Sequence, residues 1–129
     1  MNGNKKNDDK GRAMAQNNRE TGSRFEEQVA DFLKKQGFRI LERNFRCHEG
    51  EIDIIARDGA YLVFIEVKYR RTKAAGSALE AIDARKAARI RHTARFYLYC
   101  KRYPEETPCR FDAAGIDGGQ ITYIKNAFS

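Results

Sequence analysis

The sequence predicts an α/β domain in which helices flank a mixed β-sheet. Three observations support this prediction. Apolar residues recur at helical spacing in two segments, roughly residues 22–36 and 77–102. Residues 50–69 contain two β-rich runs separated by a hairpin turn signal. A strand near residues 39–45 and two more near 110–116 and 120–124 complete the order α-β-β-β-α-β-β.

The first predicted helix begins at Thr21–Gly22–Ser23, with Glu26 three residues after Ser23, a spacing typical of a helix N-terminus. Its apolar stripe consists of Phe25, Val29, Phe32 and Leu33. Gly37 fits the end of the helix. Residues 1–20 are polar and have no hydrophobic period, so we expect a disordered tail followed by one domain over residues 21–129.

The second predicted helix carries an apolar stripe made of Leu79, Ile82, Ile90, Ala94 and Tyr97, and Pro104 and Pro108 follow it. Lys86 lies four residues from both Ile82 and Ile90, on this apolar face. A lysine in that position costs free energy unless it meets an anion, which favours a functional role. The alternative is that its ammonium group reaches water at the edge of the stripe.

The hairpin between the two β-rich runs places several charged residues on one face. A two-residue turn at Asp58–Gly59 pairs Asp53 with Phe64 and Glu51 with Glu66. Directly paired residues share a face, so Glu51, Asp53, Glu66 and Lys68 are expected to point the same way. Asp53 and Glu66 would be diagonal neighbours, about 7–8 Å apart at the backbone. The apolar run Tyr61–Ile65 predicts a central strand covered on both faces.

Two carboxylates on a half-buried face repel each other, and burying them is costly unless something compensates their charge. A divalent cation would do so, and oxygen ligands without His or Cys favour Mg²⁺ or Mn²⁺. Lys68 could then orient a water molecule or neutralise charge on a phosphate. The alternative is a salt-bridged sheet face, with Lys68 paired to Glu51 or Glu66. Glu26 borders the buried stripe of the first helix and could act as a further carboxylate or as a cap.

The net charge is +7 and the isoelectric point about 9.5. Basic residues follow the acidic strand and also line the second helix, where no acid occurs between Arg85 and Arg102. We expect contacts with the phosphates of nucleic acid from Arg70, Arg71, Lys73, Arg85 and Arg89. The alternative is that the charge serves solubility alone. No base-reading motif is present, so recognition of the backbone or of shape is expected.

The cysteines and the hydropathy of the sequence argue against several classes of protein. Three cysteines without a CxxC pair argue against a disulfide framework and a thiolate zinc site. Zinc binding by cysteine with His48 and His92 has no support from spacing. No apolar run approaches the roughly 20 residues of a membrane helix, and the first residues lack the apolar stretch of a secretory signal. We therefore expect a cytoplasmic protein that does not bind membranes.

The segments TGSRFEEQVADFLKKQGFRILERNFR, GEIDIIARDG and LVFIEVKYR, with the later AIDARKAARIRHTARFYL and CRFD, resemble the YraN family of uncharacterised bacterial proteins. That family is assigned to the restriction-endonuclease-like PD-(D/E)XK nuclease superfamily. The resemblance covers about residues 22–124 and implies a restriction-endonuclease-like α-β-β-β-α-β core. Two positions depart from the pattern: Ile52 stands where the superfamily has proline, and Phe25 where the family usually has glycine.

The resemblance also implies site residues. Asp53 resembles the metal-binding aspartate, and Glu66 and Lys68 resemble the E-x-K pair, with the backbone carbonyl of Val67 as a further metal ligand. Glu26 resembles the acid of the first helix, and Lys86 falls where the second helix often carries a polar active-site residue. Asp112 lies in the RFD stretch without an assigned role.

The function implied is that of a Mg²⁺- or Mn²⁺-dependent endonuclease that hydrolyses phosphodiester bonds in DNA, with branched or damaged DNA among the expected substrates. Superfamily members include junction resolvases that often work as homodimers. The alternative is a non-catalytic nucleic-acid-binding protein that uses the basic face of the second helix. A third hypothesis is a role with an RNA or protein partner.

Overall fold

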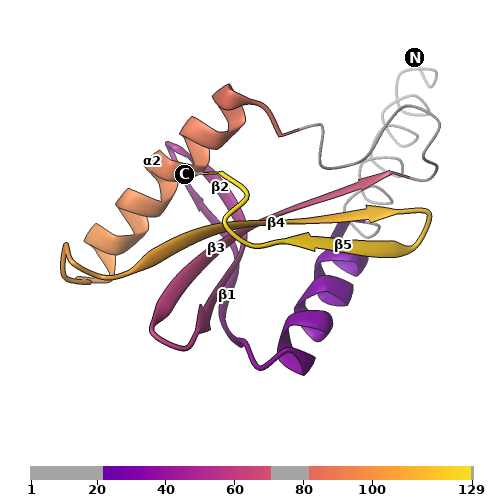
Figure 1. The fold of residues 1–129 in the computed structure, drawn as a ribbon. Helices are drawn as coiled ribbons and strands as arrows, with labels where there is room; N and C mark the ends of the chain where they lie inside the picture. Colours follow the sequence, from indigo (N-terminus) through magenta and orange to yellow (C-terminus); the bar gives the residue numbers. More distant parts are fainter. Residues whose placement is uncertain (1–21, 71–81, 129) are drawn as a thin grey trace, which may run out of the picture.

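The structure is a computed structural model that describes residues 22–70 and 82–128 (Figure 1). A helix over residues 22–35, the N-terminal helix, opens the described chain. The remaining elements are β1 (Arg39–Cys47), β2 (Gly50–Asp58), β3 (Tyr61–Arg70), α2 (Ala84–Cys100), β4 (Cys109–Asp117) and β5 (Gln120–Ile124). This confirms the α/β class and the predicted order of elements.

The five strands form one sheet in the order β1-β2-β3-β4-β5. The pairing of β3 with β4 is parallel and all other pairings are antiparallel, so the sheet is mixed. A parallel pair needs a crossover connection, and α2 lies in the segment that joins β3 to β4. Residues 62–67 of β3 are all buried, which confirms the prediction of a central strand.

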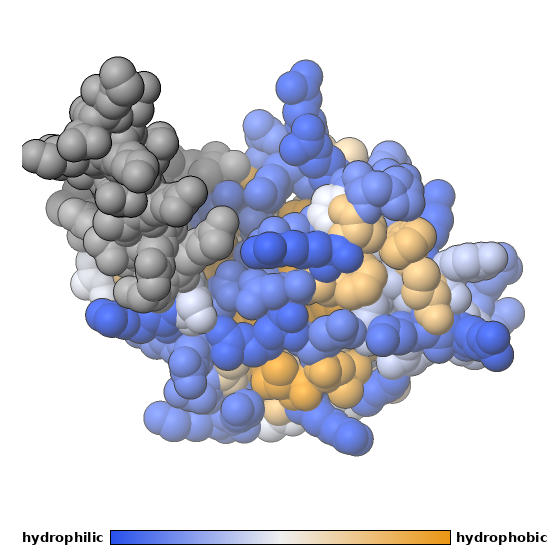
Figure 2. All heavy atoms as spheres, turned by 180° about the vertical axis from the view of Figure 1, so that it is seen from behind, coloured by the Kyte–Doolittle hydropathy of each residue, from blue (hydrophilic) through white to orange (hydrophobic). Residues whose placement is uncertain are grey.

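The two helices cover opposite faces of the sheet (Figure 1). On one face Val29 and Leu33 of the N-terminal helix pack in a cluster with Ile54 and Ile65. On the other, Ile90 and other residues of α2 pack in a second cluster with β2 and β3. Burial on both faces explains the near-continuous apolar sequence of β3. Figure 2 shows that hydrophilic residues cover most of the molecule seen from behind, with hydrophobic residues visible in separate groups.

The predicted start of the second helix was wrong. The helix begins at Ala84 rather than near Ser77, because Asp83 has an extended backbone and its side chain accepts a hydrogen bond of 2.9 Å from the Lys86 N–H. Ile82 therefore lies before the helix. Leu79, the predicted loop at residues 72–77 and the predicted tail at residues 1–20 lie outside the described residues.

For the N-terminal helix, the predicted cap at Ser23 was wrong and the predicted end at Gly37 is confirmed. Ser23 is itself helical, so it does not cap the helix in front of Glu26. Gly37 has a φ of 93°, and the Phe38 N–H donates to the Leu33 carbonyl at 2.9 Å, which closes the helix as expected. The helix therefore presents Glu26 within its body.

The predicted hairpin register was wrong, because the two-residue turn lies one residue later in the chain than predicted. Asp58 pairs with Tyr61 and Ile55 with Phe64, so the turn residues are Gly59 and Ala60. Gly59 adopts a φ of 60° there, a conformation that costs glycine little. The pairing ends with Ile54 opposite Ile65, and Phe64 lies opposite Ile55, so the predicted pairing of Asp53 with Phe64 was wrong. Asp53 and Glu66 lie beyond the end of this ladder, where the Asp53 carboxylate accepts from the Val67 N–H, and the predicted pairing of Glu51 with Glu66 is absent from the register.

Gly50, at the end of the β1–β2 turn, fixes how closely that turn approaches α2. Its φ is 151°, and a Cβ atom built on it would lie 2.9 Å from the Thr93 Oγ1 atom. The Thr93 hydroxyl is held by a 2.8 Å hydrogen bond to the Arg89 carbonyl, so it cannot easily move away. Glycine at this position therefore allows β2 and α2 to pack closely beside the charged residues.

We expect Gly50→Ala to lower the free energy of unfolding by about 1–3 kcal/mol, since overpacking at a helix contact is added to backbone strain. Urea unfolding of this variant and of Gly59→Ala would measure the effect. Gly59 also has a positive φ but has nothing within 4 Å of the added carbon, so it reports backbone strain without the steric clash. Equal losses in the two variants would contradict the role of Thr93.

No helix in the described ranges is both long and apolar enough to cross a membrane.

Candidate functional site

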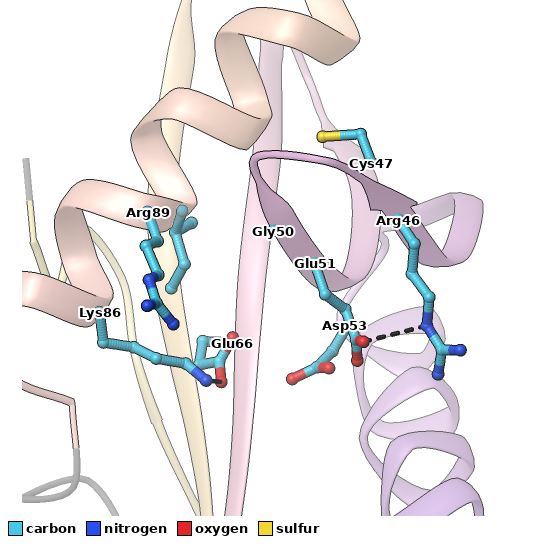
Figure 3. A pocket seen from close by; sticks show the side chains of 9 residues that line it. Arg46, Cys47, Gly50, Glu51, Asp53, Glu66, Lys86 and Arg89 are labelled. Carbon is cyan, nitrogen blue, oxygen red and sulfur yellow. Dashed lines mark ion pairs between the residues drawn. The ribbon is translucent and has the colours of Figure 1, made fainter.

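A cavity of about 400 Å³ lies between the β1–β2 turn, β3 and α2. Its walls are formed by Arg46, Cys47, Gly50, Glu51, Asp53, Glu66, Lys86, Arg89 and Ile90 (Figure 3). The predicted residues Asp53, Glu66 and Lys86 thus come together from three different elements. Arg46, Cys47 and Gly50 were not singled out from the sequence, because the turn that brings them to the cavity lies before the acidic strand.

Asp53 is buried, with 8% of its surface exposed. Its Oδ2 atom accepts a hydrogen bond of 2.8 Å from the Val67 N–H. This contact takes the place of a backbone pair, because the β2–β3 ladder extends only to Ile54 and Ile65. A strand residue directs its N–H and C=O toward the same neighbour, so the Val67 carbonyl also points toward this side of β3. The role of this carbonyl as a metal ligand stays a prediction.

Glu66 is even less exposed, at 4%, and is paired with two lysines. The Lys68 Nζ lies 3.6 Å and the Lys86 Nζ 3.3 Å from the same oxygen, Glu66 Oε1. Lys86 reaches across from α2, and Figure 3 shows its side chain directed at Glu66. The sheet-face salt bridge considered from the sequence is therefore present for Glu66. The carboxylate of Asp53, by contrast, accepts its hydrogen bond from the uncharged Val67 amide.

The electrostatics of the cavity oppose full ionisation of its acids. Burial, followed by repulsion from Glu66, raises the pKa of Asp53 to about 8, despite the Val67 hydrogen bond. Burial also raises the pKa of Glu66, although the two lysines act in the other direction. Burial would lower the pKa of Lys86, but its proximity to Glu66 raises it overall. With a pKa of about 8, Asp53 keeps its proton near neutral pH, and a cation bound by its carboxylate would displace that proton.

The donor set fits a hard divalent cation that keeps part of its water shell. Among the residues that the structure describes, no three His, Cys, Asp or Glu side chains are grouped so as to hold a metal. Asp53 and Glu66 supply two carboxylates, and Val67 can supply a carbonyl oxygen. Mg²⁺ is commonly bound by one or two carboxylates together with water and substrate phosphates, so a third side chain is not required.

Glu51 and Glu26 lie beside the site rather than at its centre. Glu51 is exposed and its carboxylate lies 3.0 Å from Arg46 Nε, at the edge of the cavity (Figure 3). Glu26 lines a neighbouring cavity that shares Arg46 and Glu51 with the first, and it lies 3.9 Å from Arg43. Burial raises the pKa of Glu26 above its ordinary value.

The unusual Phe25 does not displace Glu26 from this position. Its ring packs against Tyr69 with 4.4 Å between the ring centroids, on the face of the sheet that the N-terminal helix covers. The helix therefore uses Phe25 for packing, while the next side chain, Glu26, faces the second cavity.

The predicted phosphate-contacting residues are placed in part. Arg89 lines the cavity and Arg85 is exposed one turn earlier on α2. The side chain of Arg70, together with Arg71 and Lys73, lies outside the described residues.

Asp112, whose role was open from the sequence, is a structural residue. It is fully buried on β4 and accepts hydrogen bonds from Arg110, the Tyr123 hydroxyl and the Asn126 N–H. Arg110 also pairs with Asp58 at 2.9 Å. This network joins β4 to β5 and to the β2–β3 turn, and it does not line the cavity.

Bacterial proteins similar in sequence to this chain match it over most of its length. A UPF0102 protein of Lachnoclostridium phytofermentans is 52% identical over 103 residues, covering 80% of this chain and 87% of the relative. A UPF0102 protein of Colwellia psychrerythraea is 44% identical over 108 residues, covering 80% and 84%. Residues 25–116, which include the whole cavity wall, match the Uncharacterised protein family UPF0102. The chain therefore belongs to the UPF0102 family, the family of the YraN-like sequences.

Proposed function

We propose that this protein is a divalent-metal-dependent nuclease that hydrolyses phosphodiester bonds in DNA, with flaps and junctions as candidate substrates. The observation that carries the proposal is that two buried acids, Asp53 and Glu66, line one cavity that is open to solvent and bordered by Lys86 and Arg89. A fold gains no stability from an aspartate kept in such a position, because its burial and the nearby Glu66 both disfavour its charged form. A catalytic site, however, requires that charge.

The carboxylates of Asp53 and Glu66, with the Val67 carbonyl, are the groups that would hold the ion. When bound there, Mg²⁺ or Mn²⁺ would polarise a phosphate oxygen and lower the pKa of a water molecule. The Val67 N–H holds one oxygen of Asp53 at 2.8 Å, which fixes the orientation of the carboxylate. This fixed orientation lowers the ordering cost of binding.

The lysines would act on the phosphate. Lys68 and Lys86 now share one oxygen of Glu66, at 3.6 Å and 3.3 Å. Once the charge of Glu66 is shared with a cation, the attraction between the acid and these ammonium groups weakens. One lysine is then able to orient the attacking water and the other to contact a phosphate oxygen, where charge develops as the bond breaks. Arg89 on the same cavity wall supplies a further phosphate contact.

The test is calorimetric titration of Mn²⁺ into the wild type and Asp53→Ala, followed by incubation with flap, junction and single-stranded DNA. We expect one specific Mn²⁺ site that Asp53→Ala weakens about a hundredfold or more, and cleavage that the same variant abolishes. Glu27→Gln is the matched control, because Glu27 is an acid on the N-terminal helix away from the cavity wall and should leave both measurements unchanged.

The alternative function, nucleic-acid binding without chemistry, predicts a different pattern. Binding to DNA would survive the loss of Asp53 and Glu66, and no specific Mn²⁺ site would appear. Glu51→Gln separates the edge of the cavity from its centre: it should alter Mn²⁺ affinity less than Asp53→Ala, since Glu51 is already paired with Arg46. Absence of both Mn²⁺ binding and cleavage would overturn the proposal.

A further inference from the structure

One face of α2 connects the acidic cavity to a second hollow. Arg89, His92, Phe96 and Tyr99 follow each other at intervals of three or four residues, so their side chains project from one side of the helix. Arg89 lines the acidic cavity, whereas His92, Phe96 and Tyr99 line the second hollow. A ligand that follows this side of the helix would contact both.

The second hollow is formed largely by aromatic rings. It has a volume of about 520 Å³ and is lined by Glu49, His92, Arg95, Phe96 and Tyr99. Tyr99 is 83% exposed, the largest exposure among the described large hydrophobic residues. The ring of His48 meets that of Phe96 edge-on, with 5.3 Å between centroids and an interplanar angle of 84°. An edge-on neighbour steadies Phe96.

The charge around the hollow favours a polyanion over an apolar peptide. No acidic residue occurs in α2, and Arg95 lines the hollow beside His92. The one acid among the lining residues, Glu49, has its carboxylate 3.3 Å from His48 Nε2. Arginine beside exposed aromatic rings is the combination that binds single-stranded nucleic acid, where bases stack on the rings and cations contact the backbone.

We propose that Phe96 and Tyr99 form a stacking platform for an unpaired base of the DNA strand whose phosphate lies at the acidic cavity. The inference rests on the proposed function and extends it to a substrate class, namely DNA with a single-stranded segment. From Arg89 to Phe96 the helix rises about 10 Å, which is about three nucleotide steps of a stacked strand. A base inside a duplex cannot reach the platform, because both of its faces are occupied by neighbouring bases.

The test measures binding without cleavage. The full chain, in EDTA, is titrated with a single-stranded 12-nucleotide DNA containing 2-aminopurine and with a duplex of the same sequence. We expect quenching of 2-aminopurine on binding, and Tyr99→Ala should weaken single-strand binding about tenfold or more while changing duplex binding less than about twofold. Tyr99→Phe should restore single-strand binding, because it keeps the ring. Tyr61→Ala is the control, an exposed tyrosine at the β2–β3 turn, and should have no effect.

Three results would overturn the inference. They are an absence of single-strand binding, an equal loss of single-strand and duplex binding in Tyr99→Ala, and self-association of the wild type that Tyr99→Ala abolishes without changing DNA binding. The last would identify a second copy of the chain as the occupant. Because the assay contains no metal, ring-dependent binding can succeed even if the Mn²⁺ titration at Asp53 fails, so the two proposals fail separately.

Discussion

Asp53→Asn is expected to stabilise the metal-free protein at pH 8 while removing its response to Mn²⁺. The amide oxygen of asparagine can still accept the 2.8 Å hydrogen bond from the Val67 N–H, so packing and orientation are preserved. What disappears is a buried negative charge that Glu66 repels. Since burial and that repulsion raise the pKa of Asp53 to about 8, its charged form opposes folding.

The sign of the pH dependence follows from this pKa. The ordinary value is 3.8, so the folded protein keeps a proton that the unfolded chain releases as the pH rises from about 4 to about 8. The contribution of Asp53 to the stability of the wild type is therefore most favourable below pH 4 and falls across this window, the reverse of an aspartate held in a salt bridge. Each pH unit costs up to about 1.4 kcal/mol, so over this window we expect Asp53→Asn to gain up to about 6 kcal/mol at pH 8 and little at pH 4.

Urea unfolding at pH 4 and pH 8, with EDTA or with Mn²⁺, would measure these effects. Mn²⁺ at about a hundred times its dissociation constant should stabilise the wild type by about 2.7 kcal/mol and Asp53→Asn not at all. Affinity for Mn²⁺ should rise with pH up to about 8, because the ion must displace the proton on Asp53. A loss of stability in Asp53→Asn at pH 8 would show that the aspartate is a structural residue.

Asp112→Ala is expected to have the opposite effect and to lower the free energy of unfolding by about 3–5 kcal/mol, the usual cost of breaking a buried ion pair from one side. Asp112 is fully buried, and its two oxygens accept hydrogen bonds from the Arg110 guanidinium, the Tyr123 hydroxyl and the Asn126 N–H. Removing the carboxylate leaves these donors without an acceptor in the interior.

Asp58→Ala is the matched control, because Asp58 binds the same arginine at 2.9 Å but its side chain is 27% exposed. Its loss should cost less than about 1 kcal/mol. Urea unfolding would measure the loss of stability in both variants. Where Asp112→Ala is still folded, its affinity for Mn²⁺ should match that of the wild type. If Asp112→Ala kept its stability but lost Mn²⁺ binding, Asp112 would belong to the site.

Two of the buried aspartates, Asp53 and Asp112, show what sequence patterns can and cannot distinguish. Asp53 and Asp112 each lie in a β-rich context and each is almost inaccessible to solvent. One is paired with an amide and opposed by another acid, and the other is surrounded by donors from β4, β5 and the segment after β5. The two environments differ because different strands and segments surround each aspartate. The alternation of polar and apolar residues along a strand does not predict which segments those are.

Local patterns predicted most elements because helix and strand periodicities and turn residues act over a few positions. The apolar stripe of α2, the glycine after the N-terminal helix and the buried run of β3 each follow from short-range physics. The register of the hairpin failed because Asp58–Gly59 and Gly59–Ala60 both offer a glycine with positive φ, and packing across the sheet selects between them. The start of α2 failed because a single capping residue, Asp83, outweighs apolar spacing.

The sequence by itself determined the α/β class, the position of Asp53 on one strand and of Glu66 and Lys68 on the next, and the basic character of α2, because hydrophobic periodicity and composition are properties of single elements. Only the tertiary structure decided that Asp53 accepts its hydrogen bond from Val67 beyond the end of the β2–β3 ladder, that Lys86 pairs with Glu66 at 3.3 Å from another element, and that Tyr99 lies exposed beside Phe96. These relations depend on turn register, helix position and packing between layers, where interactions distant in sequence determine the geometry.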